Sequence, residues 1–193
     1  MNPPVDISQV ILHTERLTLR AWQPDDLDDL YAVTARDGVG QMLGWTPHTR
    51  IGQAKEMLDG LIRNSTAFAI IYEGRAVGSL GIPRYSETNF PEFKDRRCRE
   101  LSFFLSPDYW GRGLIPEAVK EVLRWLFTDV GLDAVFCGHF VFNVRSAHVQ
   151  RKLGFRPVRI TRYTTKNGTV EDNQVNLMTR DEWMAMQAGE KSQ

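Results

Sequence analysis

The sequence predicts one mixed α/β domain of the α+β kind, with a largely antiparallel, twisted sheet of about seven strands and about four flanking helices. The chain has 193 residues, 42% of them hydrophobic, which is enough for one domain with a full core. Strand-like segments follow one another in groups rather than alternating regularly with helices, and no repeat or linker divides them. We expect the domain to span residues 10–188, with flexible ends at 1–9 and 189–193.

Periodicity and turn chemistry place the individual elements. Leu17, Leu19 and Ala21 alternate with polar residues, which predicts a half-buried first strand. Proline followed by acidic residues predicts the start of a helix, and Asn-Gly predicts a hairpin turn. In chain order we expect a strand at 15–22, helices from 24 and at 50–62, strands at 67–72, 75–82 and 100–105, a helix at 115–130, a strand at 134–142, a helix at 145–153, strands at 156–164 and 169–179, and a short last helix at 180–188.

Charge and cysteine content exclude several classes of function. Lys and Arg number 24 against 24 Asp and Glu, so bulk electrostatics favours neither nucleic acid nor an anionic membrane as partner. No apolar run approaches the roughly 18 residues that span a bilayer, and the N-terminus lacks a secretory pattern. Cys98 and Cys137 are isolated, and neither they nor the histidines have metal-ligand spacing, so we expect a reduced, cytoplasmic protein without a metal.

The segment between the strand at 100–105 and the next helix is the most informative one. Gly111 and Gly113 allow the backbone to approach a ligand closely, and the helix that follows begins with unpaired N–H groups suited to phosphate. A simple tight turn would explain the same two glycines. The segment lacks the Gly-Lys-Ser/Thr of a nucleotide P-loop and the third glycine of a dinucleotide fingerprint.

Three motifs resemble those of the GNAT acetyltransferases, in particular the branch that contains the RimJ/RimL ribosomal-protein N-acetyltransferases. Residues 109–118, Tyr-Trp-Gly-Arg-Gly-Leu-Ile-Pro-Glu-Ala, resemble the loop that binds the pyrophosphate of acetyl-CoA in that family. Residues 143–155 resemble its Asn-x-x-Ser segment followed by Lys-Leu-Gly-Phe, and residues 14–20 resemble its first strand. The order of elements agrees over residues 10–180, so the resemblance covers nearly the whole chain.

The resemblance implies how acetyl-CoA would be bound. Backbone N–H groups of the loop would hold the pyrophosphate, Arg112 would add a cationic contact, and Ile115 stands where family members often have Ala or Gly. The strand at 102–105 would splay from residues 140–142, and the pantetheine arm would pair with backbone groups in the gap. The cofactor-binding residues implied are Phe104, Leu105, Gly111, Arg112, Gly113, Leu114, Ile115, Asn143 and Ser146.

Asn143 and two further residues have both a functional and a structural interpretation. Asn143 either caps the helix after it or hydrogen-bonds the pantetheine or thioester region. Ser146 is either a polar residue of a first helical turn or, by resemblance, the donor to the departing thiolate. Acyl transfer to an amine needs a base, and Glu100 is the first candidate, against a role as a solvated edge carboxylate. Glu171 and Asp172 are the alternatives.

The function implied is an acetyl-CoA-dependent N-acetyltransferase that uses direct attack by a primary amine in a ternary complex. A protein or peptide N-terminal amine is the acceptor suggested by the branch; a small-molecule amine, or a non-catalytic acyl-CoA sensor, are the alternatives. The acceptor side would be formed by the first two helices and the 83–98 loop, whose mixed charges select neither an acidic nor a cationic acceptor. The oligomeric state, monomer or homodimer, stays open.

Overall fold

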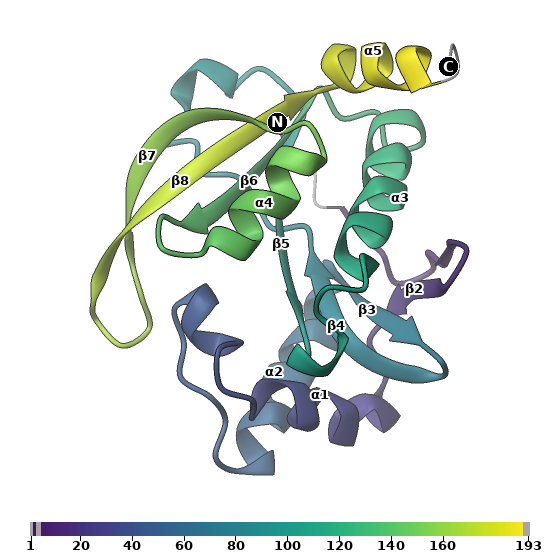
Figure 1. Ribbon diagram of the computed structural model, residues 1–193, viewed down its shortest axis with the longest axis vertical. Helices are drawn as coiled ribbons and strands as arrows, with labels where there is room; N and C mark the ends of the chain where they lie inside the picture. The colour runs from purple at the N-terminus through teal and green to yellow at the C-terminus, as the bar shows by residue number, and fades with distance from the viewer. Residues whose placement is uncertain (1, 3–4, 191–193) are drawn as a thin grey trace.

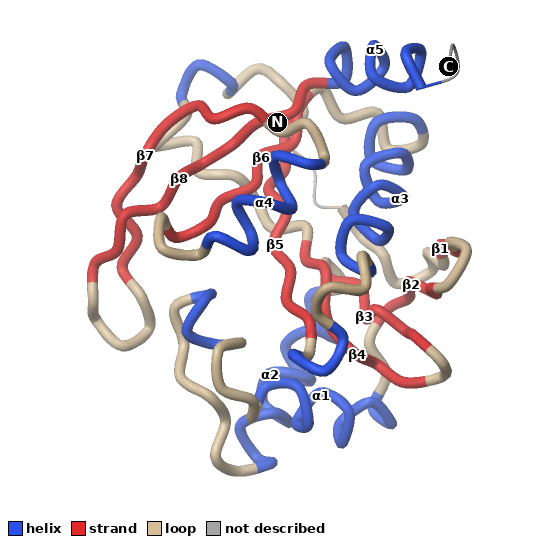
Figure 2. Tube along the Cα trace, in the orientation of Figure 1, coloured by secondary structure: helices blue, strands red, loops and turns tan. Residues whose placement is uncertain are grey.

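One sheet of eight strands runs through the part of the chain that the computed structural model describes, residues 2 and 5–190 (Figures 1 and 2). The strand order is β1-β2-β3-β4-β5-β6-β8-β7, and every pair is antiparallel except β5 with β6. The α+β class is confirmed. The strands are β1 (Leu12–His13), β2 (Leu17–Ala21), β3 (Ala67–Tyr72), β4 (Arg75–Gly81), β5 (Cys98–Leu105), β6 (Ala134–Phe140), β7 (Arg156–Thr164) and β8 (Val170–Thr179).

Helices cover both faces of the sheet. They are α1 (Leu27–Thr34), α2 (Ile51–Asn64), α3 (Leu114–Thr128), α4 (Val144–Lys152) and α5 (Arg180–Glu190). Along β3, Phe68 and Ile70 join the cluster that packs on α3, whereas Ala69 packs with α1 and α2 on the opposite face. This alternation is the period of two expected for a strand buried on both faces.

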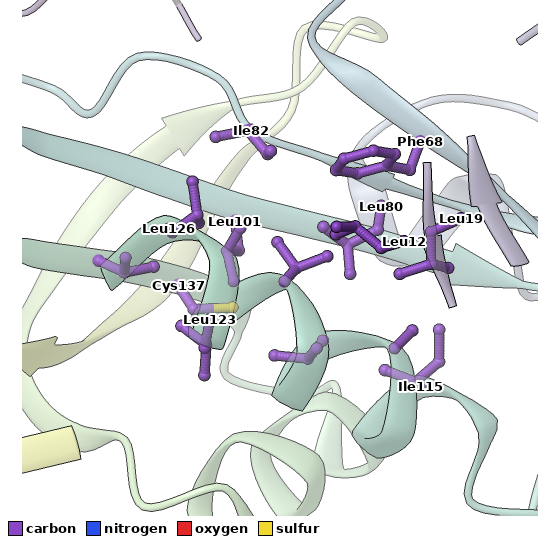
Figure 3. Close-up of a cluster of buried hydrophobic side chains, with 14 of the residues drawn as sticks. Leu12, Leu19, Phe68, Leu80, Ile82, Leu101, Ile115, Leu123, Leu126 and Cys137 are labelled. Atoms are coloured by element: carbon purple, nitrogen blue, oxygen red, sulfur yellow. The ribbon is translucent and has the colours of Figure 1, made fainter. Parts of the chain in front are cut away.

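The main core lies between α3 and the middle of the sheet (Figure 3). Leu123 and Leu126 of α3 face Leu101, Phe68 and Leu80 from three different strands, and all five side chains are at most 1% exposed. Their spacing on α3 is that of an amphipathic helix, as the sequence predicts. This packing fixes the position of the first turn of α3 relative to β5.

The central strands separate halfway along their length. β5 and β6 pair only through residues 98–101 and 134–137. Beyond that point residues 102–105 stay paired with β4, and residues 138–140 stay paired with β8. Gly78 allows the close approach of β4 to this half of β5, because a Cβ there would lie 2.3 Å from the Phe104 carbonyl oxygen. A glycine at that position lets β4 hold β5 closely on the side away from β6.

Described residues near both ends of the chain, where flexible ends were expected, lie in contacts or in a helix. Val5 and Ile7 are 6% and 0% exposed, and the Ile7 N–H donates to the Ser65 carbonyl at 2.9 Å, so this segment packs against the rest of the domain. Two apolar residues in a polar segment are enough to dock it, a signal too short for periodicity to detect. Helix α5 includes Gly189 and Glu190; residues 1, 3–4 and 191–193 lie outside the described residues. No described helix is both long and apolar enough to cross a bilayer.

Candidate active site

A cavity of about 1030 Å³ occupies the gap between β5 and β6. Its walls come from the second half of β5, the loop before α3, helix α4, the segment around residue 40 and the β7–β8 hairpin. The structure brings most of the predicted site residues together here. Those that line the cavity are Glu100, Phe104, Leu105, Gly111, Gly113, Leu114, Ile115, Asn143 and Ser146.

The loop before α3 has the geometry of an anion-binding turn. Gly111 and Gly113 have φ angles of +75° and +77°, which L side chains rarely adopt. Helix α3 begins at Leu114, so the N–H groups of its first turn have no preceding helical carbonyl, and they carry the positive end of the helix dipole. The Ile115 side chain is only 8% exposed and packs into the core. The large residue at this position therefore leaves its N–H in the first turn of α3.

A carboxylate ties this loop to the N-terminal strand region. Glu117 accepts hydrogen bonds from the Thr14 hydroxyl at 2.5 Å and the Arg16 N–H at 2.9 Å, and it forms an ion pair of 2.6 Å with the Arg16 guanidinium. Arg16 also donates to the Arg112 carbonyl at 3.0 Å. Burial would raise the pKa of Glu117, but the hydrogen bonds from Thr14 and Arg16 outweigh it and lower that pKa below its usual value.

Replacing Glu117 with glutamine is expected to loosen the loop. The ion pair with Arg16 is lost, so the free energy of unfolding should fall by about 1–2 kcal/mol. The apparent KM for acetyl-CoA, the ligand that the resemblance implies, should rise about 3–10-fold. Thermal melting and steady-state kinetics measure the two effects. Glu121→Gln is the matched control, because Glu121 pairs with exposed Arg124 one turn further along α3. Equal behaviour of the two variants would contradict the assigned role of Glu117.

Backbone groups of β5 are exposed along the gap. The Phe104 carbonyl oxygen points at β4, next to Gly78. Because strand backbone groups alternate sides, those of Phe103 and Leu105 point toward the gap instead. The Leu105 carbonyl accepts a hydrogen bond from the Trp110 indole at 3.0 Å. The Leu105 N–H is then the backbone group of this residue that can pair with a ligand in the gap. The backbone groups that face the gap are therefore those of Phe103 and Leu105 rather than those of Phe104, which also lines the cavity.

The cationic residues of the cavity differ from the expected one. Arg112 does not line the cavity; its guanidinium lies over the Tyr109 ring, 5.2 Å from the centroid. Arg145 and Lys152 of α4 line it, and Arg145 lies 4.1 Å from the centroid of the Trp110 ring. Their i, i+7 spacing, which places both on one helix face, was the signal available in the sequence.

The first turn of α4 orders Asn143 and Ser146. The Asn143 side-chain oxygen accepts from the Ser146 N–H at 3.1 Å, which is the capping role. The Ser146 hydroxyl oxygen accepts from the Gln150 side chain at 3.0 Å. Gln150 is 0% exposed and was missed by the sequence analysis, because a single glutamine in a helix gives no periodic signal.

Glu100 lies where β5 and β6 begin to separate. Burial raises the pKa of its carboxyl to about 7, and no neighbouring charge contributes to that shift. It is therefore not the solvated edge carboxylate of the alternative interpretation. A Cβ at Gly138 would lie 3.3 Å from the Glu100 carboxylate and 2.8 Å from the Asn173 amide, so both side chains converge on this bare stretch of β6. A group ionising near neutral pH can accept a proton there.

The other candidate bases and nucleophiles are placed differently. Glu171 and Asp172 do not line the cavity, and exposed Asp172 pairs with Arg162 at 3.1 Å. Cys137 does line it, but burial raises the pKa of its thiol well above the usual value, so it stays protonated. Of the described residues that line the cavity, only Glu100 has a carboxylate, against the cationic Arg84, Arg145, Lys152 and Lys166.

The β7–β8 hairpin reaches across the far end of the cavity. The Lys166 N–H donates to the Gly44 carbonyl at 2.8 Å, and a Cβ at Gly44 would lie 3.1 Å from the Tyr163 ring. Trp45 and Phe104 form the wall beneath, with ring centroids 6.3 Å apart. Residues 44 and 166 are distant in sequence, and nothing in their local pattern predicts this contact. Within the described residues, no group of three or more His, Cys, Asp or Glu side chains could hold a metal ion.

Comparisons with known proteins agree with this geometry. Residues 16–156 match the acetyltransferase (GNAT) domain family. The chain is 27% identical over 173 residues to the uncharacterized N-acetyltransferase YoaA of Bacillus subtilis, covering 86% of this chain and 94% of that protein. It is 30% identical over 118 residues to the FsC-acetyl coenzyme A-N(2)-transacetylase of Aspergillus fumigatus, covering 60% and 50%.

Solved structures share the fold. The crystal structure of a GCN5-related N-acetyltransferase from Brucella melitensis superposes with a TM-score of 0.80 at 20% identity, covering 98% of this chain and 86% of that one. The family match spans the glycine loop, the separated strands β5 and β6 and helix α4, which all contribute to the cavity. The chain belongs to the GNAT acetyltransferases.

Proposed function

We propose that this protein is an acetyl-CoA-dependent N-acetyltransferase in which a primary amine attacks the thioester directly. The observation that carries the proposal is a carboxyl with a pKa of about 7 in the same cavity as an anion-binding turn. A protein that only sensed acyl-CoA would need the turn but not a half-buried carboxyl whose charge has no compensating partner. Burying such a group costs stability, which is typical of catalytic sites.

The anionic half of acetyl-CoA fits the loop and its surroundings. The N–H groups of Leu114 and Ile115, at the positive end of α3, would donate hydrogen bonds to the pyrophosphate. Arg145 and Lys152 provide cationic side chains on the same side, and the exposed edge of β5 provides N–H and C=O groups for the amides of the pantetheine arm. Acetyl-CoA supplies the activated acetyl group when it is bound.

Glu100 and Ser146 have different roles in the reaction: Glu100 takes the proton of the amine, and Ser146 stabilises the departing thiolate. A primary amine must be neutral to attack, and it must lose one proton once its nitrogen is acylated. Glu100, half ionised near neutral pH, accepts that proton directly or through a water molecule. As the C–S bond breaks, its electron pair passes to sulfur, and the Ser146 hydroxyl donates a hydrogen bond to the thiolate, which solvent later protonates.

The contact between the hairpin and the segment around residue 40 bears on the acceptor. The three motifs resemble the RimJ/RimL-like branch, which would imply a protein N-terminal amine. However, a polypeptide N-terminus needs an open groove for the residues that follow it, and the Lys166–Gly44 hydrogen bond joins two segments that line the cavity. This contact supports a small primary amine as the acceptor.

Release of free CoA thiol from acetyl-CoA tests the proposal. The protein is mixed with panels of amino acids, polyamines, aminoglycosides and short peptides, and products are identified by mass. We expect turnover with at least one small amine and little with peptides. Turnover only with peptide N-termini would overturn the acceptor class but keep the N-acetyltransferase. Tight acetyl-CoA binding without thiol release in any panel would favour the sensor.

A further inference from the structure

A buried amide network lies beneath the proposed catalytic serine. Gln150 of α4 makes three hydrogen bonds, although α4 covers the sheet at its surface (Figure 1). Its side-chain nitrogen donates to the Gly138 carbonyl at 3.2 Å and to the Ser146 hydroxyl oxygen at 3.0 Å. Its oxygen accepts from the Asn176 side chain of β8 at 2.6 Å. Gln150 and Asn176 are 0% and 6% exposed, so water does not replace these bonds.

The chemistry of the partners fixes the orientation of the Gln150 amide. A backbone carbonyl can only accept a hydrogen bond, so the amide atom that faces Gly138 must be nitrogen. The opposite orientation would place two oxygens together in a buried site, which costs free energy on both. The same nitrogen faces Ser146, and the Ser146 oxygen is therefore an acceptor in this bond.

A serine hydroxyl that accepts from Gln150 has its own hydrogen free to point elsewhere. Ser146 lines the cavity, and no oxygen within residues 2 and 5–190 accepts a hydrogen bond from its hydroxyl. Gly138, the other acceptor of Gln150, is the first β6 residue beyond the ladder with β5. The network is thus anchored at the point where the central strands separate.

We infer that Gln150 is a positioning residue that holds Ser146 as a hydrogen-bond donor toward the departing thiolate. This inference rests on the role of Ser146 in the proposed function. Without the Gln150 donor, the Ser146 hydroxyl can rotate and give its hydrogen to a neighbouring carbonyl. With the donor in place, rotation away from the cavity would set the serine hydrogen against an N–H hydrogen.

Two substitutions at Gln150 test the inference, each made with and without Ser146→Ala. Gln150→Met keeps the length but removes the donor, and we expect kcat to fall about 5–20-fold while the KM for acetyl-CoA changes less than about twofold. Gln150→Glu keeps the shape but presents an acceptor that attracts the serine hydrogen, so kcat should fall further. In the Ser146→Ala protein, neither substitution should lower kcat by more than about twofold, because residues that act together are not additive.

Controls separate positioning from a structural role. Arg151→Gln changes the adjacent, exposed residue of α4 and should leave kcat unchanged. Thermal melting shows which variants remain folded. The two Gln150 variants perturb the core differently, and the test needs only one of them to fold. If the Gln150 substitutions lower kcat equally with and without Ser146, the inference is overturned while the role of Ser146 stands. If Ser146→Ala alone leaves kcat unchanged, the proposed role of Ser146 is wrong and the inference falls with it.

Discussion

Glu100→Gln is expected to lower kcat about 100-fold or more, because the amide cannot accept a proton from the attacking amine. The substitution conserves size and keeps the β5 backbone, so affinity for acetyl-CoA should remain within about twofold of wild type. Steady-state thiol release with the best amine of the panel measures kcat, and calorimetric titration with CoA measures affinity. Glu171→Gln is the matched control, since Glu171 lies outside the cavity and should leave kcat unchanged. A Glu100→Gln enzyme with wild-type kcat would assign the proton transfer to water or to another group.

The same substitution should stabilise the protein at alkaline pH. Burial raises the pKa of Glu100 from 4.5 to about 7, so the folded state holds this proton more tightly than the unfolded state. Below pH 4.5 both states are protonated and the glutamate carries no penalty. Stability then decreases as pH rises toward 7, and above pH 7 the full cost is present, at about 3 kcal/mol.

Denaturant unfolding at pH 5 and pH 8 checks this sign. Glu100→Gln should be about as stable as wild type near pH 5 and clearly more stable at pH 8. A variant that is destabilised at pH 8 would mean that the ionised carboxylate has favourable partners in the folded protein. Such a result would also remove the reason for a pKa near neutrality.

Gly113→Glu is expected to weaken acetyl-CoA binding about 100-fold, because a carboxylate is placed at the N-terminus of α3 where the pyrophosphate would lie. The φ angle of +77° adds backbone strain of about 1–2 kcal/mol for any L residue. Titration with CoA gives the affinity, and Gly113→Ala separates strain from charge, since alanine brings only the strain.

Gly74→Glu is the control for a charged residue in a strained turn outside the site. Gly74 has a φ angle of +80° in the β3–β4 turn and does not line the cavity. The Gly74→Glu protein should lose stability but keep its affinity for CoA. If Gly113→Glu bound CoA as tightly as wild type, the pyrophosphate could not lie at the start of α3.

Local features of the sequence predicted the glycine loop, and the resemblance to the GNAT family added Ser146 and supported Glu100 as catalytic candidates. Gly111 and Gly113 stand between a strand and a helix, and each of those elements is defined by residues close in sequence. Glu100 could be chosen because it precedes that loop on the same strand. Its raised pKa could not be predicted, because it depends on burial by segments as distant as residue 173.

Contacts between distant segments account for what the sequence analysis missed. The Arg16–Glu117 pair, the Gly44–Lys166 hydrogen bond and the Asn176–Gln150 hydrogen bond each join residues that only the folded sheet brings together. Phe104 was assigned one residue away from the backbone group that faces the gap. Which side a strand backbone faces depends on its register with the neighbouring strand, and register is set by pairing rather than by composition.

The dependence of kcat/KM on pH, measured for the best amine acceptor, tests the central claim that Glu100 is the general base. The base must be ionised, so activity should rise with pH through a pKa of about 7 in the wild type. In Glu100→Gln this limb should vanish, leaving only the ionisation of the amine itself. The same limb near pH 7 in both proteins would contradict the assignment of Glu100.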